Sequence, residues 1–265
     1  MVDNDWIVKK LNAFLENPKS QRKLSTFIDI DCGYHRSGTI WNSEATVSLV
    51  REVINSSVLS FAGLYVHCGD SYNVKDMEMT VSDVQNLTID HLIHLADRLK
   101  SLQIEVPLLS TGSTPSCSQP CDKFSYVQEM HPGNYIFYDA QQFLLGSCQL
   151  NEIACTVATR VVGHYPSRNE LLIDCGFSAL TKQGEDRLPS GYVIFPKNPE
   201  LKLTSMTQEL GKITSLERIN YSKYPIGKIL FMYPYHSCAT AALYDRYYIH
   251  ENFIVTDIWK PCRGW

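Results

Sequence analysis

Short apolar segments alternate with longer segments of helical period over the first 150 residues, and this alternation constrains the fold more than any other feature of the sequence. Apolar and β-branched side chains predict strands at residues 24–30, 61–66, 106–109 and 135–138. Helices are predicted over residues 5–16, about 43–56 and 84–102. Polar residues and glycines follow each strand, as is typical of β/α units whose sites lie at the carboxyl ends of parallel strands.

Four strands of this kind make half of an eight-stranded β/α barrel. Such an open half would leave two long apolar edges free to pair with other chains. After Leu150 the sequence changes to short β-rich segments separated by Pro, Asn, Gly and Ser, without a comparable helical period. We therefore predict a partial (half) TIM-type β/α barrel over residues 1–150 and a mostly antiparallel β domain over residues 151–265.

The charge and the cysteines of the chain argue against several classes of protein. A formal net charge of −4 offers no basic surface for nucleic acid, and no apolar run approaches the length of about 18 residues that a membrane span needs. The first residues, MVDNDW, do not form a basic and apolar leader, so we expect a cytoplasmic protein. Nine scattered cysteines, an odd number, indicate free thiols in a reducing compartment.

The third predicted strand runs into a turn that suits a phosphate group. Residues 106–116 read VPLLSTGSTPS, in which Gly112 lets the backbone approach an anion closely. Ser113 and Thr114 add hydroxyl donors, and Pro115 ends the strand. Turns rich in Ser, Thr and Gly are also common without any ligand, so an ordinary turn is the alternative.

The segment MYPYHSCAT contains the strongest candidate for a metal site. If it is a strand, His236 and Cys238 project from the same face and can both reach one zinc ion. A thiolate beside an imidazole favours zinc over magnesium or calcium. A His-x-Cys pair also occurs by chance, and the pair of Cys117 and Cys121 is a weaker candidate because no second pair lies nearby.

Four other side chains follow predicted strands or lie at their starts. Arg36 can serve as a fixed cation for a phenolate or carboxylate, or it can be a surface arginine. His67 can lie flat against a cofactor ring, and Tyr72 and Tyr135 can donate phenolic hydrogen bonds; each can equally be a packing residue. No Gly-x-Ser-x-Gly, Walker or Gly-x-Gly-x-x-Gly segment occurs, which argues against a serine hydrolase, a P-loop NTPase or an NAD enzyme.

Taken together, these segments resemble the eukaryotic-type D-serine dehydratases, pyridoxal-phosphate lyases of the alanine-racemase barrel class that also includes the D-threonine aldolases. The similarity runs over essentially the whole chain and in the same order. It is carried by DCGYHRSG, GLYVHCGDSY, STGSTPS and HPGNYIFYDAQQ in the first part, and by HYPSRNELLIDCGFSALTK, YPYHSCAT and DIWKPCRGW in the second.

The resemblance implies a role for each matching residue. Arg36 would face the phenolic oxygen of pyridoxal 5'-phosphate, His67 would stack on its pyridine ring, and Tyr72 would lie on the pyridine side. His236 and Cys238 would hold zinc beside the substrate. The implied reaction is β-elimination from a small D-3-hydroxy amino acid, with D-serine giving pyruvate and ammonia, in an expected homodimer. The phosphate would be surrounded by Gly112, Ser113, Thr114, Gly133, Asn134 and Tyr135.

The sequence departs from the family pattern at two places. The family's cofactor lysine lies in a Pro-His-x-Lys-Thr-His-Lys segment, and the printed sequence contains no such segment, as expected for an N-terminally truncated member. TQELG stands where the family has Gln-Glu-His-Gly, so Leu210 replaces a histidine. Two alternatives therefore stay open: a D-threonine aldolase-like lyase, and a truncated non-catalytic paralogue that acts as a binding or assembly partner.

Overall fold

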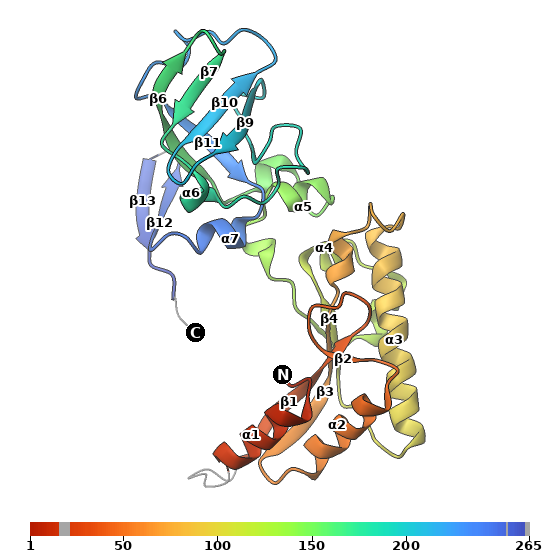
Figure 1. Cartoon of the computed structure of the whole chain (residues 1–265). Coiled ribbons are helices and arrows are strands. Elements are labelled where there is room, and N and C mark those ends of the chain that lie inside the picture. The colour runs from red at the N-terminus through yellow and green to blue at the C-terminus, as the bar shows by residue number, and fades with distance from the viewer. Residues whose placement is uncertain (16–21, 253, 263–265) are drawn as a thin grey trace. The chain divides into compact units, whose positions relative to one another are not determined.

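The computed structural model describes residues 1–15, 22–252 and 254–262 (Figure 1). The chain divides into two compact units, Met1–Gly133 and Asn134–Trp265, and each has its own hydrophobic core. The predicted fold class is confirmed: a parallel α/β half barrel is followed by a separate antiparallel β domain. The predicted boundary after residue 150 stays a prediction.

The first unit consists of a parallel sheet with helices along the chain between its strands. Its α-helices are α1 (Asp5–Leu15), α2 (Glu44–Asn55), α3 (Val81–Ser101) and α4 (Thr114–Ser118). Its strands are β1 (Leu24–Asp31), β2 (Thr39–Ile40), β3 (Leu59–His67), β4 (Leu109–Gly112) and β5 (Glu129–Met130). Two 3₁₀ helices, η1 (Gly69–Tyr72) and η2 (Asp122–Tyr126), complete it.

The parallel sheet has a helix-covered apolar face and a polar face. The strand order is β2-β1-β3-β4-β5, and every pairing is parallel. Ile28 and Leu64 pack in the same core as side chains from α2 and α3. Because successive side chains of a strand alternate between faces, Asp29, Tyr65 and His67 point to the opposite side. The first unit therefore presents polar groups where a complete barrel would have its interior.

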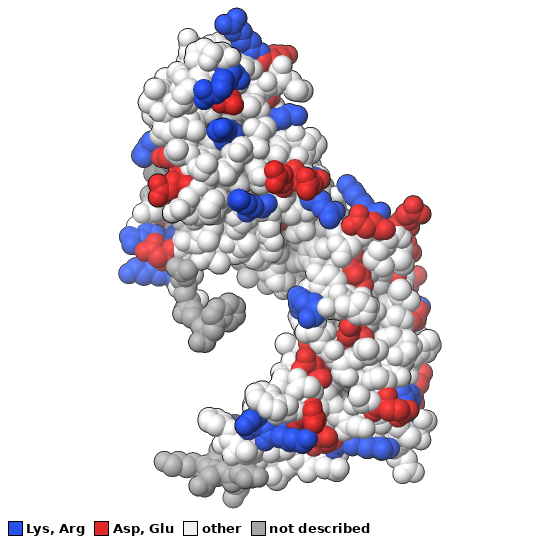
Figure 2. All heavy atoms as spheres, in the orientation of Figure 1, with Lys and Arg blue, Asp and Glu red and all other residues white. Residues whose placement is uncertain are grey.

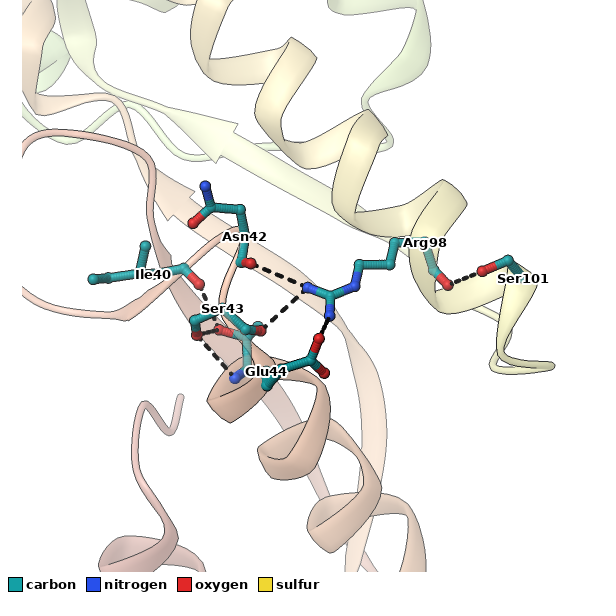
Figure 3. A network of polar contacts seen from close by, with 7 residues as sticks. Ile40, Asn42, Ser43, Glu44, Arg98 and Ser101 are labelled. Atoms are coloured by element: carbon teal, nitrogen blue, oxygen red, sulfur yellow. Dashed lines mark hydrogen bonds and ion pairs between the residues drawn. The ribbon is translucent and has the colours of Figure 1, made fainter.

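Capping side chains fix the starts of α2 and α3, and an arginine of α3 connects the two helices. Ser43 caps α2 by accepting a hydrogen bond from Thr46 N at 3.2 Å, and Thr80 caps α3 in the same way. Arg98 of α3 donates to the carbonyl oxygens of Asn42 and Ser43 at 3.1 and 3.4 Å and pairs with Glu44 (Figure 3). The guanidinium thus ties the start of α2 to the last turn of α3.

The edges of the parallel sheet differ from the expected long apolar edges. The strands at its two ends, β2 and β5, have two residues each. Beside β1, Val2 N donates to Phe27 O at 2.9 Å, and Asp29 N donates to Val2 O at 2.8 Å. The start of the chain therefore pairs with part of β1, and short edge strands limit pairing with other chains.

The second unit is built mainly from antiparallel strands. Its strands are β6 (Val157–Tyr165), β7 (Glu170–Ile173), β8 (Val193–Ile194), β9 (Leu201–Met206), β10 (Gly211–Ser215), β11 (Ile229–Pro234), β12 (Tyr247–Glu251) and β13 (Ile254–Trp259). Its helices are η3 (Asn134–Ile136), α5 (Ala140–Leu144), η4 (Leu150–Glu152), α6 (Phe177–Leu180) and α7 (Ser237–Ala241).

Six of these strands form one sheet that almost closes on itself. The order is β8-β11-β6-β7-β10-β9, with β12 and β13 as a separate hairpin. An isolated bridge between Gly191 and Leu203 joins the region before β8 to β9. Tyr192 N donates to Leu203 O at 3.3 Å, and Leu203 N donates to Ser190 O at 3.1 Å. Val161, Leu171 and Phe195 lie in the core that this sheet encloses.

Two predicted strands of the first 150 residues are wrong in position or type. The strand predicted at 106–109 is β4, which begins only at Leu109 and so includes the serine, threonine and glycine assigned to a turn. The strand predicted at 135–138 is absent, because η3 begins at Asn134 and both Phe137 N and Tyr138 N donate to Asn134 O. The positive φ of Tyr138 (49°) also excludes an extended strand there.

The surface and the thiols agree with an ordinary globular chain. On the face drawn in Figure 2, positive and negative side chains are interspersed. None of the helices in the described ranges is long and apolar enough to cross a membrane. All nine cysteines are free thiols, as the sequence indicated.

Candidate functional site

The carboxyl ends of β1 and β3 bring two of the predicted cofactor residues into one hollow. Arg36 from the loop after β1 and His67 at the end of β3 both line it. Its other lining residues are Asp29, Ile30, Asp31, Cys32, Tyr34 and Ser37. The parallel sheet therefore brings a guanidinium and an imidazole to one hollow, although they lie 31 positions apart in the sequence.

The loop that carries Arg36 is shaped by a buried carboxylate. Asp31 accepts hydrogen bonds from Gly33 N at 2.9 Å and His35 N at 3.1 Å, and its other oxygen lies 2.7 Å from His35 Nδ1. Although burial opposes the effect, these hydrogen bonds hold the pKa of Asp31 below its usual value. The ionised carboxylate therefore holds the loop by hydrogen bonds to Gly33 and His35.

His67 is a neutral imidazole with two phenol rings nearby. The Tyr34 ring lies 5.9 Å from it at a tilt, and the Tyr72 ring lies 6.4 Å away and nearly parallel. Burial, the Arg36 guanidinium and the His131 imidazole lower the pKa of His67 from 6.5 to about 4. At neutral pH the ring therefore carries no charge and offers a flat aromatic surface.

Arg36 is an exposed cation whose charge is not neutralised by a contact. Its guanidinium forms no hydrogen bond or ion pair with any residue of the described ranges. Asp29, which lines the same hollow, accepts instead from Ser37 Oγ at 2.9 Å. Burial raises the pKa of Asp29, although the hydrogen bond from Ser37 and the charge of Arg36 oppose this effect. Arg36 is thus available to an anionic oxygen.

The residues of the predicted phosphate turn lie where β4 passes into α4, and their serine side chain is already engaged. Gly112 ends β4 and Ser113 caps α4. Ser113 Oγ accepts from Ser116 N at 3.2 Å and lies 2.8 Å from Ser71 Oγ, while Ser113 N donates to Ser116 Oγ at 2.9 Å. Ser113 and Thr114 are both buried. This capping box makes the turn rigid and connects it to the loop after β3.

Gly112 is required by close packing at the end of β4. A Cβ added there would lie 3.0 Å from both Cys117 Sγ and His131 N, and its φ is +156°. Of the two cysteines considered as a chelating pair, Cys117 therefore packs on this glycine, while Cys121 lies in the loop that follows α4. In the described residues, no group of three or more His, Cys, Asp or Glu side chains is arranged to hold a metal ion.

The segment after β5 places its three predicted phosphate residues differently. Gly133 is exposed, with open space where a Cβ would be, and the Tyr135 side chain is 53% exposed. The Asn134 side chain is buried and bonds to Asp139 and to Ser237 Oγ. In this structure Gly133 and Tyr135 are open to a ligand, whereas Asn134 supports its own unit.

The predicted metal pair lies at a strand-to-helix junction. The expectation that His236 and Cys238 project from one face of a strand is wrong, because β11 ends at Pro234 and His236 caps α7, which contains Cys238. His236 Nδ1 lies 2.8 Å from Gln183 Oε1, so in the neutral ring with a proton on Nδ1 the lone pair is on Nε2. Cys238 is exposed, and partial desolvation with the Asp139 charge raises the pKa of its thiol.

The structure shows a histidine that the sequence analysis missed. His131, which follows β5, stacks on Tyr65 with ring centroids 4.2 Å apart. Its Nδ1 lies 3.1 Å from Ser110 Oγ, which donates to Glu129 Oε1 at 2.8 Å, and its Nε2 lies 3.2 Å from Val66 O. The alternation of Glu129 and His131 in the sequence was a signal that these side chains share one face.

Leu210, which replaces a histidine of the family pattern, lies in the turn between β9 and β10. Its side chain is 39% exposed, and its carbonyl oxygen accepts from Thr207 N at 2.8 Å. This backbone hydrogen bond closes the turn and needs no particular side chain. The structure therefore places Leu210 in the turn between β9 and β10.

A parallel α/β half barrel followed by a separate antiparallel β unit matches the fold of the alanine-racemase-like proteins. The family model for the alanine racemase N-terminal domain matches residues 1–141, and the model for a serine dehydratase domain matches residues 154–250. The chain is 37% identical over 280 residues to a D-serine dehydratase of Dictyostelium discoideum, covering 98% of this chain and 68% of the relative. The protein belongs to the D-serine dehydratase family of lyases.

Other comparisons agree with this family. A D-serine dehydratase of Schizosaccharomyces pombe is 29% identical, covering 100% of this chain and 67% of the relative. The solved D-threo-3-hydroxyaspartate dehydratase from Delftia sp. HT23 superimposes with a TM-score of 0.84 at 23% identity, covering 100% of this chain and 72% of that one. Variants of a D-threo-3-hydroxyaspartate dehydratase with a histidine or a cysteine replaced by alanine have also been solved, the cysteine variant in a metal-free form; the two positions are two residues apart.

Proposed function

We propose that this chain provides the cofactor face and the metal pair of a pyridoxal 5'-phosphate- and zinc-dependent D-serine ammonia-lyase, which converts D-serine to pyruvate and ammonia. The observation that carries the proposal is the free Arg36 guanidinium beside the neutral His67 ring, at the carboxyl ends of parallel strands, in a member of the D-serine dehydratase family. The substrate is a small D-3-hydroxy amino acid. As proposals, the enzyme is a homodimer and cytoplasmic.

The residues of the hollow fit the coenzyme. Arg36 would bind its phenolic oxygen, the uncharged ring of His67 would pack against the pyridine, and Tyr72 would lie beside it. When bound, pyridoxal phosphate would act as an electron sink for the charge left on the substrate carbon. Since Ser113 is held by its capping box, we assign it to the shape of the phosphate turn. The phosphate would be surrounded by Gly112, Ser113, Thr114, Gly133, Asn134 and Tyr135.

His236 and Cys238 fit zinc as a two-residue donor set. The hydrogen bond from His236 Nδ1 to Gln183 directs the lone pair of Nε2 outward, which is the usual arrangement of a metal-ligating histidine. The exposed Cys238 thiol would bind as a thiolate after losing its proton. Two protein ligands leave positions for substrate, and zinc would supply a Lewis acid that helps the β-hydroxyl leave. The altered histidine and cysteine of a D-threo-3-hydroxyaspartate dehydratase have the same spacing as His236 and Cys238, which supports this assignment.

The cofactor lysine is the one part of the reaction for which these residues provide no candidate. The printed sequence contains no Pro-His-x-Lys-Thr-His-Lys segment, so we assign no residue to the cofactor lysine. A second candidate function is a non-catalytic member of the family that binds metal and an assembly partner. A D-threonine aldolase-like reaction is less favoured. The aldolases of this class tend to have a carboxylate at the position of Cys238, and this chain has a cysteine there.

The two functions are separated by adding the missing segment. Sequencing the transcript upstream of Met1 shows whether the reading frame continues into a lysine-bearing strand, and the extended protein should then form pyruvate from D-serine in a coupled assay. The 265-residue chain alone should form no borohydride-reducible link between a lysine and pyridoxal phosphate. Pyruvate formation by the extended protein supports the lyase; a transcript that starts at Met1 and a chain without that link support the non-catalytic member.

Metal content tests the zinc assignment separately. C238A should lower bound zinc to background, whereas C262A, which removes another exposed thiol, should leave it unchanged. Zinc would be measured by atomic emission after dialysis. Equal zinc in C238A and the unaltered chain would exclude Cys238 as a ligand.

A further inference from the structure

A buried carboxylate, Asp139, lies at the centre of a hydrogen-bond network in the second unit. Its Oδ1 accepts from Gln142 N at 2.8 Å, and its Oδ2 accepts from Ser237 N at 2.8 Å and from Asn134 Nδ2. Ser237 Oγ closes the network by donating to Asn134 Oδ1 at 2.7 Å. Asp139 and Ser237 have no exposed surface, and Asn134 is 6% exposed. The network therefore links the starts of α5 and α7 without the help of solvent (Figure 1).

The network ends on the backbone between the two proposed zinc ligands. Ser237 separates His236 from Cys238, and its N–H is the group that Asp139 holds. His236 is still extended (φ −129°, ψ 102°), whereas Cys238 is already helical. The chain thus changes direction at the residue that the carboxylate fixes. Since each peptide unit is planar, holding Ser237 N also orients the His236 carbonyl and the first turn of α7.

We infer that Asp139 is a positioning residue for the metal pair: by holding the Ser237 N–H, it sets the distance and direction between the His236 imidazole and the Cys238 sulfur. The inference rests on the proposed function, which assigns zinc to that pair. An ionised aspartate only accepts hydrogen bonds, so it satisfies all three donors at once. An asparagine would turn its NH₂ group toward at least one of them and leave a buried donor unpaired.

The sharpest test removes the Ser237 N–H and leaves the carboxylate in place. S237P does this, because proline has no N–H and is well tolerated at the first position of a helix. The extended backbone of His236 also suits a residue that precedes proline. S237A is the matched control, since it removes the same hydroxyl and keeps the N–H that Asp139 binds.

Cobalt(II) is the probe, because its bond to a thiolate gives a charge-transfer band whose intensity and position report binding and coordination geometry without any reaction. In the full chain we expect S237P to bind cobalt(II) about 10- to 100-fold more weakly than S237A, with a shifted band, as for other residues that orient metal ligands. Equal affinities and spectra for S237P and S237A would overturn the inference.

D139N provides a second route in case S237P does not fold. It should weaken cobalt(II) binding to a similar extent, whereas S43A, which removes the cap of α2 in the first unit, should lower Tm and leave the metal affinity unchanged. A D139N protein with a lower Tm and an unchanged affinity would show that Asp139 only stabilises the fold. If the unaltered chain gives no charge-transfer band with cobalt(II), the metal assignment fails and the inference fails with it. If the unaltered chain and D139N bind cobalt(II) equally tightly, the metal assignment stands and only the positioning role of Asp139 is wrong.

Discussion

Protonation of His67 provides a direct test of the proposed cofactor face. Burial, Arg36 and His131 lower its pKa from 6.5 to about 4, so the folded protein keeps this ring neutral in a range where the unfolded chain binds a proton. Above pH 6.5 the ring is neutral in both states and has no effect on stability. As the pH falls from 6.5 to about 4, the unfolded state gains a proton that the folded state does not, so the free energy of unfolding decreases.

The size of this decrease follows from the pKa and the exposure of the ring. A tenfold change in a protonation equilibrium is worth about 1.4 kcal/mol, so the complete effect would be about 3 kcal/mol. His67 is only half-buried, and solvent screening reduces the effect to about 1–2 kcal/mol. H67Q has no titrating ring and should lack this part of the acid sensitivity. R36M removes the second-largest cause of the low pKa and should raise the pKa of His67.

Two measurements check the prediction. The His67 Cε1–H signal, identified as the one missing in H67Q, gives the pKa directly by NMR for the chain and for R36M. Urea unfolding at several pH values gives the free energy of unfolding, and the difference between the chain and H67Q cancels the contributions of all other groups. An H67Q protein that loses as much stability as the unaltered chain between neutral pH and about pH 4, or a His67 pKa near 6.5, would refute the reasoning.

Two further predictions concern the same unit. G112A should destabilise the first unit by about 1–3 kcal/mol, because the new Cβ would lie 3.0 Å from both Cys117 Sγ and the His131 backbone nitrogen. G133A is the control, since a Cβ at position 133 would meet open space. If G112A and G133A have the same Tm, this packing argument is wrong. E129Q should lower the pKa of His131 further, since burial already lowers it and the Glu129 carboxylate opposes that effect. NMR titration of the His131 ring measures the shift, and a rise in its pKa would disprove the assigned role of Glu129.

The elements with a clear local signal were predictable from the sequence. The helix predicted over about 43–56 is α2, and the helix predicted over 84–102 lies almost entirely within α3. The strand predicted at 61–66 lies within β3. In these cases apolar periodicity, capping residues and burial in one core all favour the same structure, and such agreement between levels is what makes a local prediction reliable.

The wrong predictions arose where short polar and apolar patterns are ambiguous. Residues 135–138 are apolar and aromatic like a strand, yet Asn134 O accepts two hydrogen bonds from the following backbone and closes a turn. His236 and Cys238 have the spacing of a strand face, but Pro234 ends β11 and the chain turns directly into α7. The decisive contact there is the bond from Ser237 N to Asp139, which lies 98 residues away in the sequence. No local pattern contains that contact.

The residues on the polar face of the half barrel could not be identified one at a time from the sequence. Asp29, Tyr65 and Ser110 each look unremarkable as residues of a strand, because a polar side chain on one face of a strand is usually a solvated one. In the structure the groups on this face affect one another. The charge of Arg36 acts to lower the pKa of both His67 and Tyr65. The ring of Tyr65 in turn stacks on His131. Burial nevertheless raises the pKa of Tyr65 overall. The parallel pairing of β1, β3 and β4 brings these groups together, so the chemistry depends on register between strands that are distant in sequence.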